Sequence, residues 1–443
     1  MVSGASAESQ GACGSRAVRR VVIVGAGPAG LASAIAAARS GRHILLVEKN
    51  SEPGRKLLLA GGGRANLWDP ALPAIQACPA YGRAGRFLHQ ALAAFDFAEF
   101  LSDLGVECER RTGGPRQGVV FVRGGSRRLL EALLAKANEL GVEMIRESPV
   151  RAVTGLPAGG FEVRTDRRSC ECDHLVLCTG GLTYPTTGST GDGYGLAEAL
   201  GHAVDPPRPA LGDFVTAPCF TELAGFAVAD AALVLRRDER RIAAGRGPLL
   251  FTHRGISGPA VIDLSLELAR AVQSDKEPRG IRIAADLLPG TTAEEATAEF
   301  LALARSKPRS SSADLGRGTA LGARLTNVLA RLAGFPPERR LGQASHRDFA
   351  ALAAVAKSLS FNLAAPLDPS LAMVTCGGVA TAELDARTME SRIRPGLFLA
   401  GELLSPAGPC GGYNLLMAFA TGWAAGNGAQ RGQPHSGLPR GDV

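Results

Sequence analysis

Short apolar runs alternate with helical patterns in the first half of the chain. Residues 21–24 (VVIV), 44–47 (ILLV) and 175–178 (LVLC) are apolar throughout, which is typical of buried strands. An alanine-rich segment over 29–39 lies between the first two runs and predicts a helix. Leucines at helical spacing predict an amphipathic helix over 126–140. The order of strand, helix and strand predicts an α/β domain.

The pattern changes near residue 204. Strand-like pieces broken by prolines follow and predict an inserted β domain. Residues 291–345 have the composition of helices, and strand-like sequence resumes after them. Both ends of the chain, 1–17 and 428–443, are rich in Gly, Ser, Gln and Pro without periodicity. We therefore expect mobile tails at both ends.

A glycine-rich turn joins the first strand to the first helix. Gly25, Gly27 and Gly30 form Gly-x-Gly-x-x-Gly: the first permits a tight turn, the second lets backbone approach a pyrophosphate, and the third lets helix pack on strand. The helix includes Ala29, and its free N–H groups would face the phosphates. Glu48 ends the second strand, 18 residues after Gly30, where a carboxylate binds ribose hydroxyls. The order predicts a dinucleotide-binding unit; the alternative is a glycine turn without a ligand.

The segment that follows Glu48 has no counterpart in a simple nicotinamide dehydrogenase. It combines basic side chains with three successive glycines, which allow backbone to approach a flat or anionic group. We expect it to contact a ligand, and the alternative is a flexible surface loop. The residues expected to bind the cofactor here are Lys49, Arg55, Lys56, Gly61, Gly62, Gly63, Arg64 and Asn66.

Glycines also follow two later strands, the run at 175–178 and a short apolar strand that begins near residue 396. An apolar helix then runs to about residue 425. In flavoproteins with two dinucleotide domains, such a strand and helix return to the first sheet and place a helix N-terminus against the flavin, where the helix dipole favours negative charge. The residues expected to bind the cofactor here are Thr179, Gly180, Gly181, Gly401, Glu402, Gly412, Tyr413 and Asn414.

Six ordered segments resemble the HI0933-like family of FAD-dependent oxidoreductases, whose branches include aminoacetone oxidase-like and bile-acid enone reductase-like flavoproteins. The segments are 54–66, 179–194, 251–259, 374–379, 388–391 and 401–419. The resemblance implies non-covalent FAD and three lobes. The lobes are a Rossmann-type FAD-binding domain (18–203 and 376–427), an inserted β-barrel-like substrate domain (204–290 and 346–375) and a helical subdomain (291–345).

The chain departs from the family pattern near the expected flavin face. Ala65 stands where the family has a cysteine, residues 405–407 replace an Asp-Val-Asp run, and residues 416–417 replace Gln-Trp. Two carboxylates and an indole are therefore lost, which predicts a less acidic pocket and a specialised substrate. The residues expected to line the substrate pocket are Trp68, Ser405, Ala407, Leu416 and Met417.

Two residues are candidates for catalysis. His253 lies in a segment that resembles the family motif, and an imidazole suits acid or base chemistry near neutral pH; the alternative is that it shapes a glycine-rich loop. Tyr413 is the second candidate, with hydrogen bonding to the cofactor as the alternative. Tyr184 fits a core aromatic equally well. No Ser-His-Asp arrangement or metal-ligand cluster stands out.

Composition fits a soluble cytoplasmic enzyme without a secretory signal or membrane span: 443 residues are 45% apolar, and no apolar stretch reaches 18 residues. We expect the nine cysteines to be reduced. The net charge of +7 comes mostly from scattered arginines, so no nucleic-acid partner is expected. The oligomeric state is open.

Two enzyme reactions fit these features. In the first and favoured reaction, a C–N or C–C bond of a small molecule is oxidised by hydride transfer to flavin N5, and dioxygen or another acceptor reoxidises the flavin. In the second, NAD(P)H serves as a transient reductant and the flavin reduces a conjugated alkene. A third class, a non-catalytic flavin-bearing scaffold or nucleic-acid-modification partner, is also open.

Overall fold

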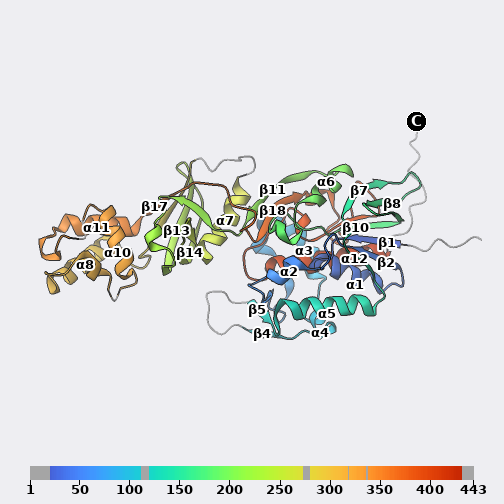
Figure 1. The fold of residues 1–443 in the computed structure, drawn as a ribbon, viewed down its shortest axis with the longest axis horizontal. Coiled ribbons are helices and arrows are strands. Elements are labelled where there is room, and N and C mark those ends of the chain that lie inside the picture. The colour runs from blue at the N-terminus through green and yellow to red at the C-terminus, as the bar shows by residue number, and fades with distance from the viewer. Residues whose placement is uncertain (1–19, 111–118, 273–279, 318, 336–337, 432–443) are drawn as a thin grey trace, which may run out of the picture.

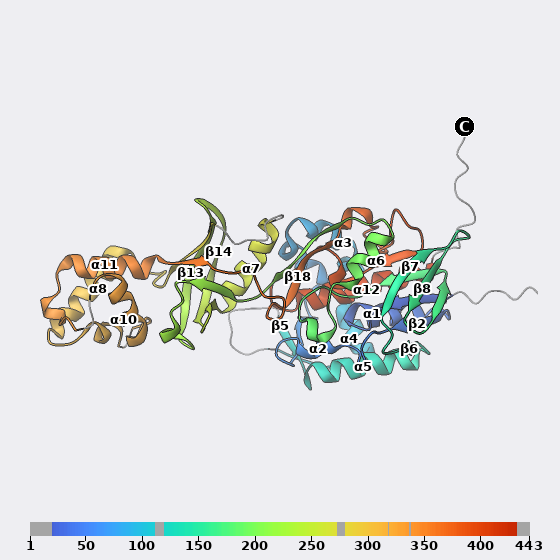
Figure 2. The same cartoon turned by 45° about the horizontal axis from the view of Figure 1, so that its top comes forward.

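The structure is a computed structural model that describes residues 20–110, 119–272, 280–317, 319–335 and 338–431. An α/β domain, a barrel and a group of helices lie in a row along the long axis of the molecule (Figure 1). The view turned by 45° shows the same order (Figure 2). The α/β domain and the barrel are joined by β11 (Val204–Ala210) and β18 (Val374–Val379), which pair antiparallel beside the junction.

A five-stranded parallel sheet forms the centre of the α/β domain. Its strands, in the order β19-β10-β1-β2-β6, are Leu397–Leu399, His174–Leu177, Arg20–Val24, His43–Val47 and Glu143–Ile145. The middle strands are apolar along almost their whole length because both faces of the sheet are covered. This arrangement confirms the Rossmann-type prediction, including the return of a late strand, β19, to the first sheet.

Helices α1 (Pro28–Ala38) and α12 (Tyr413–Arg431) pack closely beside this sheet. Small residues make the close approach possible: a Cβ on Gly422 would lie 2.2 Å from the Ala29 carbonyl oxygen, and one on Gly426 would lie 2.3 Å from that of Ser33. The amphipathic helix expected at 126–140 is α5 (Gly125–Glu139), which buries its leucines. Smaller helices of this domain are α2 (Arg55–Leu59), α3 (Gly85–Ala93), α4 (Phe97–Asp103) and α6 (Asp192–Ala199).

Two small antiparallel sheets complete the α/β domain. One has the order β3-β5-β4 and consists of Asn66–Trp68, Val119–Val122 and Cys108–Arg110. The other has the order β7-β8-β9 and consists of Val150–Gly155, Phe161–Thr165 and Ser169–Cys172. The first of these sheets lies next to the start of α12 and helps to position it.

The inserted domain is a closed six-stranded barrel, as expected for a β-barrel-like insert. Its strands are β12 (Phe214–Ala217), β13 (Ala227–Arg237), β14 (Arg240–Phe251), β15 (Gly255–Ser257), β16 (Ile281–Asp286) and β17 (Leu359–Leu363). Phe214, Phe251 and Phe361 are fully buried in the core of this domain. Helix α7 (Pro259–Ala271) packs against β14 and reaches β11 and β18.

The outermost lobe consists of α8 (Ala293–Ser306), α9 (Ser312–Gly316), α10 (Gly322–Leu332) and α11 (His346–Lys357). The expected boundary at residue 345 needs correction, because Ser345 caps α11 and this helix packs against α8. The helical lobe therefore extends to Lys357. Residues 1–17 and 432–443 of the expected tails lie outside the described residues, whereas 428–431 belong to α12.

Candidate functional site

A cavity of about 600 Å³ opens where β1, β2 and β10 end. Val24, Val47 and Cys178 line it at these ends, so it occupies the crevice in which doubly wound sheets bind their ligands. Most of the residues expected to bind a cofactor meet here although they come from distant parts of the chain. Those that line the cavity are Gly25, Gly27, Ala29, Glu48, Lys49, Arg55, Lys56, Gly61, Gly62, Asn66, Thr179, Gly180, Glu402, Gly412 and Asn414.

The three glycines of the first turn have different surroundings. A Cβ on Gly25 would lie 2.5 Å from the Cys178 carbonyl oxygen, and one on Gly30 would lie 1.8 Å from the Gly25 carbonyl oxygen. A Cβ on Gly27 would have nothing within 4 Å and would project into open space. Gly25 and Gly30 are therefore required by the protein itself, whereas Gly27 keeps space free for a ligand beside the N-terminus of α1.

Glu48 is buried at the end of β2 and is fixed by hydrogen bonds from the chain. One carboxylate oxygen accepts from the Ala26 backbone N–H at 2.8 Å, and the other accepts from the Asn50 backbone N–H at 2.9 Å and its side-chain amide at 2.7 Å. The side chain also lines the cavity. A carboxylate fixed in this way presents its remaining lone pairs to hydroxyl donors such as those of a ribose.

The loop that contains η2 (Pro185–Thr187) closes over this end of the cavity. Lys49 Nζ donates to Thr190 Oγ1 and to Asp192 Oδ2, at 2.6 Å in each case. The Asn50 side chain donates to the Thr187 carbonyl oxygen at 3.1 Å. Lys49 therefore anchors the wall of the cavity through an ion pair with Asp192.

A second network lies under the middle of the cavity. Lys56 Nζ contacts both carboxylate oxygens of Glu402, at 2.8 and 2.7 Å, and donates to Thr183 Oγ1 at 2.7 Å. Glu402 also accepts from the Thr375 backbone N–H at 2.8 Å. Gly181 is needed here because a Cβ would lie 2.1 Å from Thr375 Oγ1. Lys56 lines the cavity, and Glu402 neutralises its charge.

Two polar atoms on the cavity wall support a bound cofactor. Asn66 Oδ1 and Thr179 Oγ1 are buried and have no hydrogen-bond partner within the described part of the chain. Unpaired buried polar atoms are costly, and two of them in residues that line a cavity fit a site that a ligand completes. Gly62 has a φ of +65° and open space at its Cβ position. Together with Gly27 and Glu48, these features fit an elongated dinucleotide such as FAD.

Gly63 and Arg64 do not line the cavity. The Gly63 carbonyl oxygen accepts from the backbone N–H and hydroxyl of Ser126, and the Arg64 guanidinium lies 5.6 Å from the Phe121 ring centroid. Gly30, Gly181 and Gly401 support the walls from behind; a Cβ on Gly401 would lie 2.7 Å from that of Ala29. Gly63, Arg64, Gly181 and Gly401, which we expected to bind the cofactor, therefore lie behind or beside the wall, and Gly30 has the packing role expected of it.

Tyr413 belongs to an aromatic cluster behind the cavity. Its ring centroid is 5.2 Å from that of Trp68 and 6.1 Å from that of Tyr81, whose hydroxyl donates to the Tyr413 carbonyl oxygen at 2.7 Å. A Cβ on Gly412 would lie 2.2 Å from Trp68 N, so the glycine lets α12 begin against β3. The cluster positions α12, and the structure gives Tyr413 no place on the cavity wall.

The expected substrate residues also lie away from the cavity. Asn414, Leu415 and Ala418 form the face of α12 that lines it, whereas Leu416 and Met417 point to other sides of the helix and are buried in the core. Ser405 continues the pairing of β18, because its N–H donates to the Val379 carbonyl oxygen and its carbonyl oxygen accepts from Gly377 N–H. Ala407 is buried in a small apolar cluster and Trp68 in the aromatic cluster.

His253 lies at a second, smaller cavity of about 210 Å³ at the junction end of the barrel. It occupies the turn between β14 and β15, in which Thr252 N–H donates to the Gly255 carbonyl oxygen. Its side chain is exposed and does not line the main cavity. His253, a catalytic candidate from the sequence, therefore lines this second cavity and not the main one.

Sequence reasoning missed most of the wall next to the barrel. Leu211, Met373, Val374 and Cys410 line the cavity there, together with Tyr184. Leu211 and Met373 lie on the two strand connections that lead into and out of the barrel. The signal was available, because segments that flank an insertion near a ligand crevice must pass beside that crevice.

Comparisons with known proteins agree with this site. Residues 19–428 match the family model described as HI0933-like protein Rossmann domain. The chain belongs to this family. Its members are FAD-dependent oxidoreductases, which confirms the resemblance noted from the sequence motifs.

Two relatives in the family are similar over almost their whole length. The chain is 32% identical to the ribosomal RNA dihydrouridine synthase of Escherichia coli (strain K12) over 91% of this chain and 96% of that protein. It is 31% identical to the 3-dehydro-bile acid delta(4,6)-reductase of Clostridium scindens over 93% of this chain and 99% of that protein.

A solved structure supports the fold. It is the 3-ketosteroid-delta4-(5alpha)-dehydrogenase of Rhodococcus jostii RHA1 in complex with 4-androstene-3,17-dione. The two structures superpose with a TM-score of 0.51 at 18% identity, over 94% of this chain and 97% of that chain. FAD is thus supported as the cofactor by the family and by the cavity. Among the described residues, no helix has the length and apolar character needed to cross a membrane.

Proposed function

We propose that this protein is an FAD-dependent reductase of a carbon–carbon double bond that is conjugated to a carbonyl group. The observation that carries the proposal is what the two relatives have in common. One is named for making dihydrouridine, in which the 5,6 double bond of a uracil ring is saturated, and the other for reducing the 4,6 double bonds of a 3-oxo bile acid. The substrates differ, but both alkenes are conjugated to a carbonyl.

Of the two reactions that fit the sequence, the sequence favoured oxidation of a C–N or C–C bond. The proposal favours the other one, reduction of a conjugated alkene. Flavin, when bound, supplies hydride to the alkene carbon that lies β to the carbonyl. The chain's own contribution is to bind the dinucleotide through Gly27, Glu48 and the N-terminus of α1. Asn66 and Thr179 offer the unpaired polar atoms that orient it.

The wall next to the barrel suits the substrate. Leu211, Met373 and Val374 give it an apolar surface that excludes water, and Tyr184 and Cys410 are its polar members. A conjugated ketone has a flat apolar body and one strong hydrogen-bond acceptor, which matches a wall of this composition.

Anaerobic half-reactions test the proposal. The purified protein with FAD is reduced by NADH or NADPH and then mixed with cyclohexenone, 4-androstene-3,17-dione or uridine. We expect at least one to reoxidise the flavin rapidly and to gain two hydrogen atoms by mass spectrometry. The proposal fails if all conjugated ketones leave the flavin reduced while candidate amines bleach the oxidised flavin.

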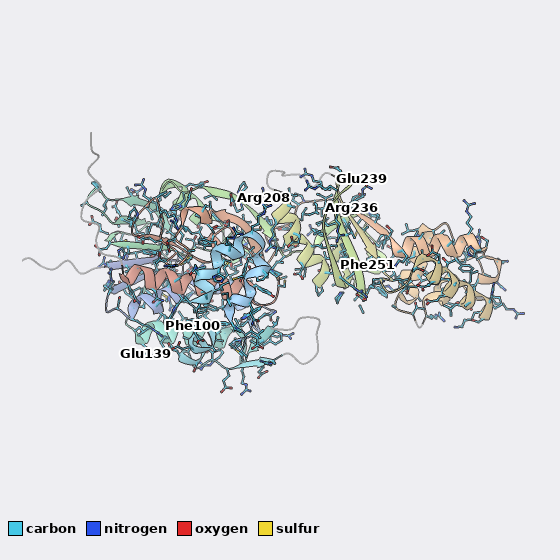
Figure 3. All side chains as sticks on the ribbon, turned by 180° about the vertical axis from the view of Figure 1, so that it is seen from behind. Phe100, Glu139, Arg208, Arg236, Glu239 and Phe251 are labelled. Carbon is cyan, nitrogen blue, oxygen red and sulfur yellow. The ribbon has the colours of Figure 1, made fainter. Side chains whose placement is uncertain are left out.

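A second candidate function, reduction of a uracil within RNA, has its own observation on the barrel. Arg236 of β13 is directly opposite Arg241 of β14 and Arg282 of β16, so three arginines form a row across three strands. Like charges directly opposite each other destabilise a sheet, and such a row is favourable beside an anionic partner. Figure 3 shows Arg236 and Glu239 at the tip of this hairpin and Arg208 on the same long edge of the molecule.

Acidic neighbours neutralise the row only in part. Arg236 donates to the Glu239 carbonyl oxygen, and Arg282 lies 4.0 Å from the Glu239 carboxylate. The helical lobe beyond it, residues 291–357, carries ten Lys and Arg against six Asp and Glu. This surface gathers basic residues and supports the RNA candidate, against the expectation of no nucleic-acid partner.

Substitution of Arg236, Arg241 and Arg282 by glutamine tests the RNA candidate. We expect RNA binding to weaken about equally for all sequences and the slope against log salt to fall by about 1 per lost phosphate contact. Arg246→Gln is the matched control, because Asp230 already neutralises Arg246 on the same strand pair. Unchanged RNA affinity and salt slope in the triple variant would remove this candidate and leave a small-molecule substrate.

A further inference from the structure

Among the groups that line the main cavity, Tyr184 has no assigned role. It follows the Thr179-Gly180-Gly181 turn and precedes η2, and it lies on the part of the wall that is closest to the barrel connections. Its hydroxyl forms no hydrogen bond with another residue that the structure describes, yet the side chain is only half buried and reaches the cavity. A hydroxyl in this position is available to a ligand.

The backbone holds Tyr184 in an unusual conformation. Its φ is +53° and its ψ is +59°, the left-handed region, which bulky residues avoid and which the following Pro185 also disfavours. Three hydrogen bonds maintain it: Tyr184 N–H donates to the Pro369 carbonyl oxygen, and the Thr187 N–H and hydroxyl donate to the Tyr184 carbonyl oxygen. Strain that is retained by several bonds concentrates at functional sites.

The other proton donors on the wall are already engaged or unsuitable. Lys49 is paired with Asp192, and Lys56 is paired with Glu402. The Cys178 thiol is buried at the glycine turn, where the dinucleotide phosphates belong. Tyr184 contributes a hydroxyl and Cys410 a thiol to the wall next to the barrel.

We propose that Tyr184 is the general acid that protonates the substrate, an inference that rests on the proposed reduction of a conjugated alkene. With FAD bound, its reduced flavin would supply hydride to the carbon β to the carbonyl, and the π electrons would move to the carbon α to the carbonyl. The Tyr184 O–H bond breaks, and its proton forms the new C–H bond at that α-carbon. The phenolate then takes a proton from water at the cavity mouth. In total the substrate gains two hydrogens and two electrons. A nicotinamide would return two electrons to the flavin for the next turnover.

The surroundings keep this acid protonated. Burial raises the pKa of Tyr184 above its ordinary value of about 10, and the nearby Asp213 carboxylate and Cys410 thiol raise it further. Asp213 is held in place by a hydrogen bond from the Ser257 hydroxyl. A phenol whose pKa lies above neutral is fully protonated at physiological pH and gives up its proton only to a strong base, such as the carbanion formed after hydride transfer.

Two classes of alkene distinguish this role from others. Reduction of a conjugated ketone needs an acid at the α-carbon, whereas a nitroalkene gives a stable nitronate after hydride transfer and needs none. For Tyr184→Phe we expect flavin reoxidation by cyclohexenone to slow on the order of 100-fold, as for the loss of a general acid. Reoxidation by a nitroalkene should stay within about threefold, and deuterium from D₂O should lose its facial preference at the α-carbon.

The controls separate the alternatives. Tyr194→Phe removes the hydroxyl of a buried tyrosine that does not line the cavity, and it should leave both rates unchanged. Equal slowing of both alkenes in Tyr184→Phe would overturn the assignment in favour of substrate binding, and no slowing would overturn it outright. A selective loss in Cys410→Ala would assign the proton to the thiol instead. If the wild-type enzyme reduces neither alkene, the proposed function itself fails.

A second variant guards against a folding defect in Tyr184→Phe. 3-Fluorotyrosine at position 184 keeps the ring and hydroxyl but makes the phenol more acidic. The alkaline limb of the enone profile should then move to lower pH, which a purely structural residue would not cause. Ultraviolet difference titration of the flavin-free protein against Tyr184→Phe supplies a readout without turnover: we expect Tyr184 to ionise above its ordinary value. Ionisation at or below that value would contradict the proposed environment.

Discussion

The two ends of the main cavity are built in different ways. At the end near β1 and β2, the chain itself fixes the polar groups: Glu48 accepts three hydrogen bonds, and Lys49 is held by Asp192. At the end near the barrel, the wall consists of apolar side chains with Tyr184 and Cys410 among them, and the Tyr184 hydroxyl has no partner among the described residues. One end is preorganised for a ligand of fixed shape, and the other is left for a substrate to complete.

The difference follows from topology. The glycine turn and Glu48 of the first end lie on consecutive elements within about 30 residues, so one local pattern specifies them. The second end is assembled from four segments spread between residues 184 and 412: residue 184, residue 211, residues 373–374 and the loop at 409–412. A relative can therefore keep the first end and exchange the second, which agrees with the different substrates named for two relatives of almost equal identity.

The largest expected effects distinguish a glycine at the first end that the fold requires from one that cofactor binding requires. Gly30→Ala should destabilise the protein by about 3 kcal/mol or more, because its Cβ would collide with the Gly25 carbonyl oxygen. Gly27→Val should purify without FAD and therefore colourless, because its side chain would occupy the space kept free for the ligand. In the flavin-free form it should be as stable as wild type, because that space is open. Thermal unfolding of flavin-free protein and flavin content measure the two effects. A fully stable Gly30→Ala variant would show that the backbone shifts to relieve the collision between the new Cβ and the Gly25 carbonyl oxygen.

The second prediction concerns Glu48. Glu48→Ala should weaken FAD binding by about 1.5 to 3 kcal/mol, the worth of a charged hydrogen bond. For Glu48→Gln the loss should approach that of alanine, because donors face both carboxylate oxygens and the new amide NH₂ would meet a donor. Fluorescence titration of the flavin-free variants with FAD measures both. A near-normal affinity in Glu48→Gln would mean that these internal hydrogen bonds contribute little.

Sequence reasoning succeeded where backbone constraints decide the structure. Gly25, Gly27 and Glu48 could be placed because a glycine turn and a strand end have few geometric solutions. It failed at Met417 and Leu416, because a list of replaced residues does not say which side of α12 faces the cavity. It could not foresee the pairing of Lys56 with Glu402, which lies 346 residues away, or the place of His253 at the second cavity.

The third prediction tests the cavity end near the barrel by comparing a methionine in the core with one that lines the cavity. Met417→Trp should lower stability by about 1–3 kcal/mol through overpacking, with no specific effect on substrate choice, because Met417 is 1% exposed in the core. Met373→Ala should keep FAD and stability but change KM for a conjugated ketone several-fold, because Met373 lines the wall. Steady-state kinetics and thermal unfolding distinguish the two. A selective change of substrate preference in Met417→Trp would support the earlier expectation that Met417 lines the substrate pocket.

The smallest expected effect compares two arginines that the sequence treated alike. Arg55 lines the cavity and makes no ion pair with another described residue, whereas Arg64 stacks on Phe121 outside it. Arg55→Ala should therefore weaken FAD binding by about 1 kcal/mol, the scale of one screened charge contact near the surface, and Arg64→Ala should leave the affinity unchanged. The difference should shrink as salt rises, since exposed charges are screened. Equal losses in both variants would mean that long-range charge, and not position on the wall, attracts the phosphates.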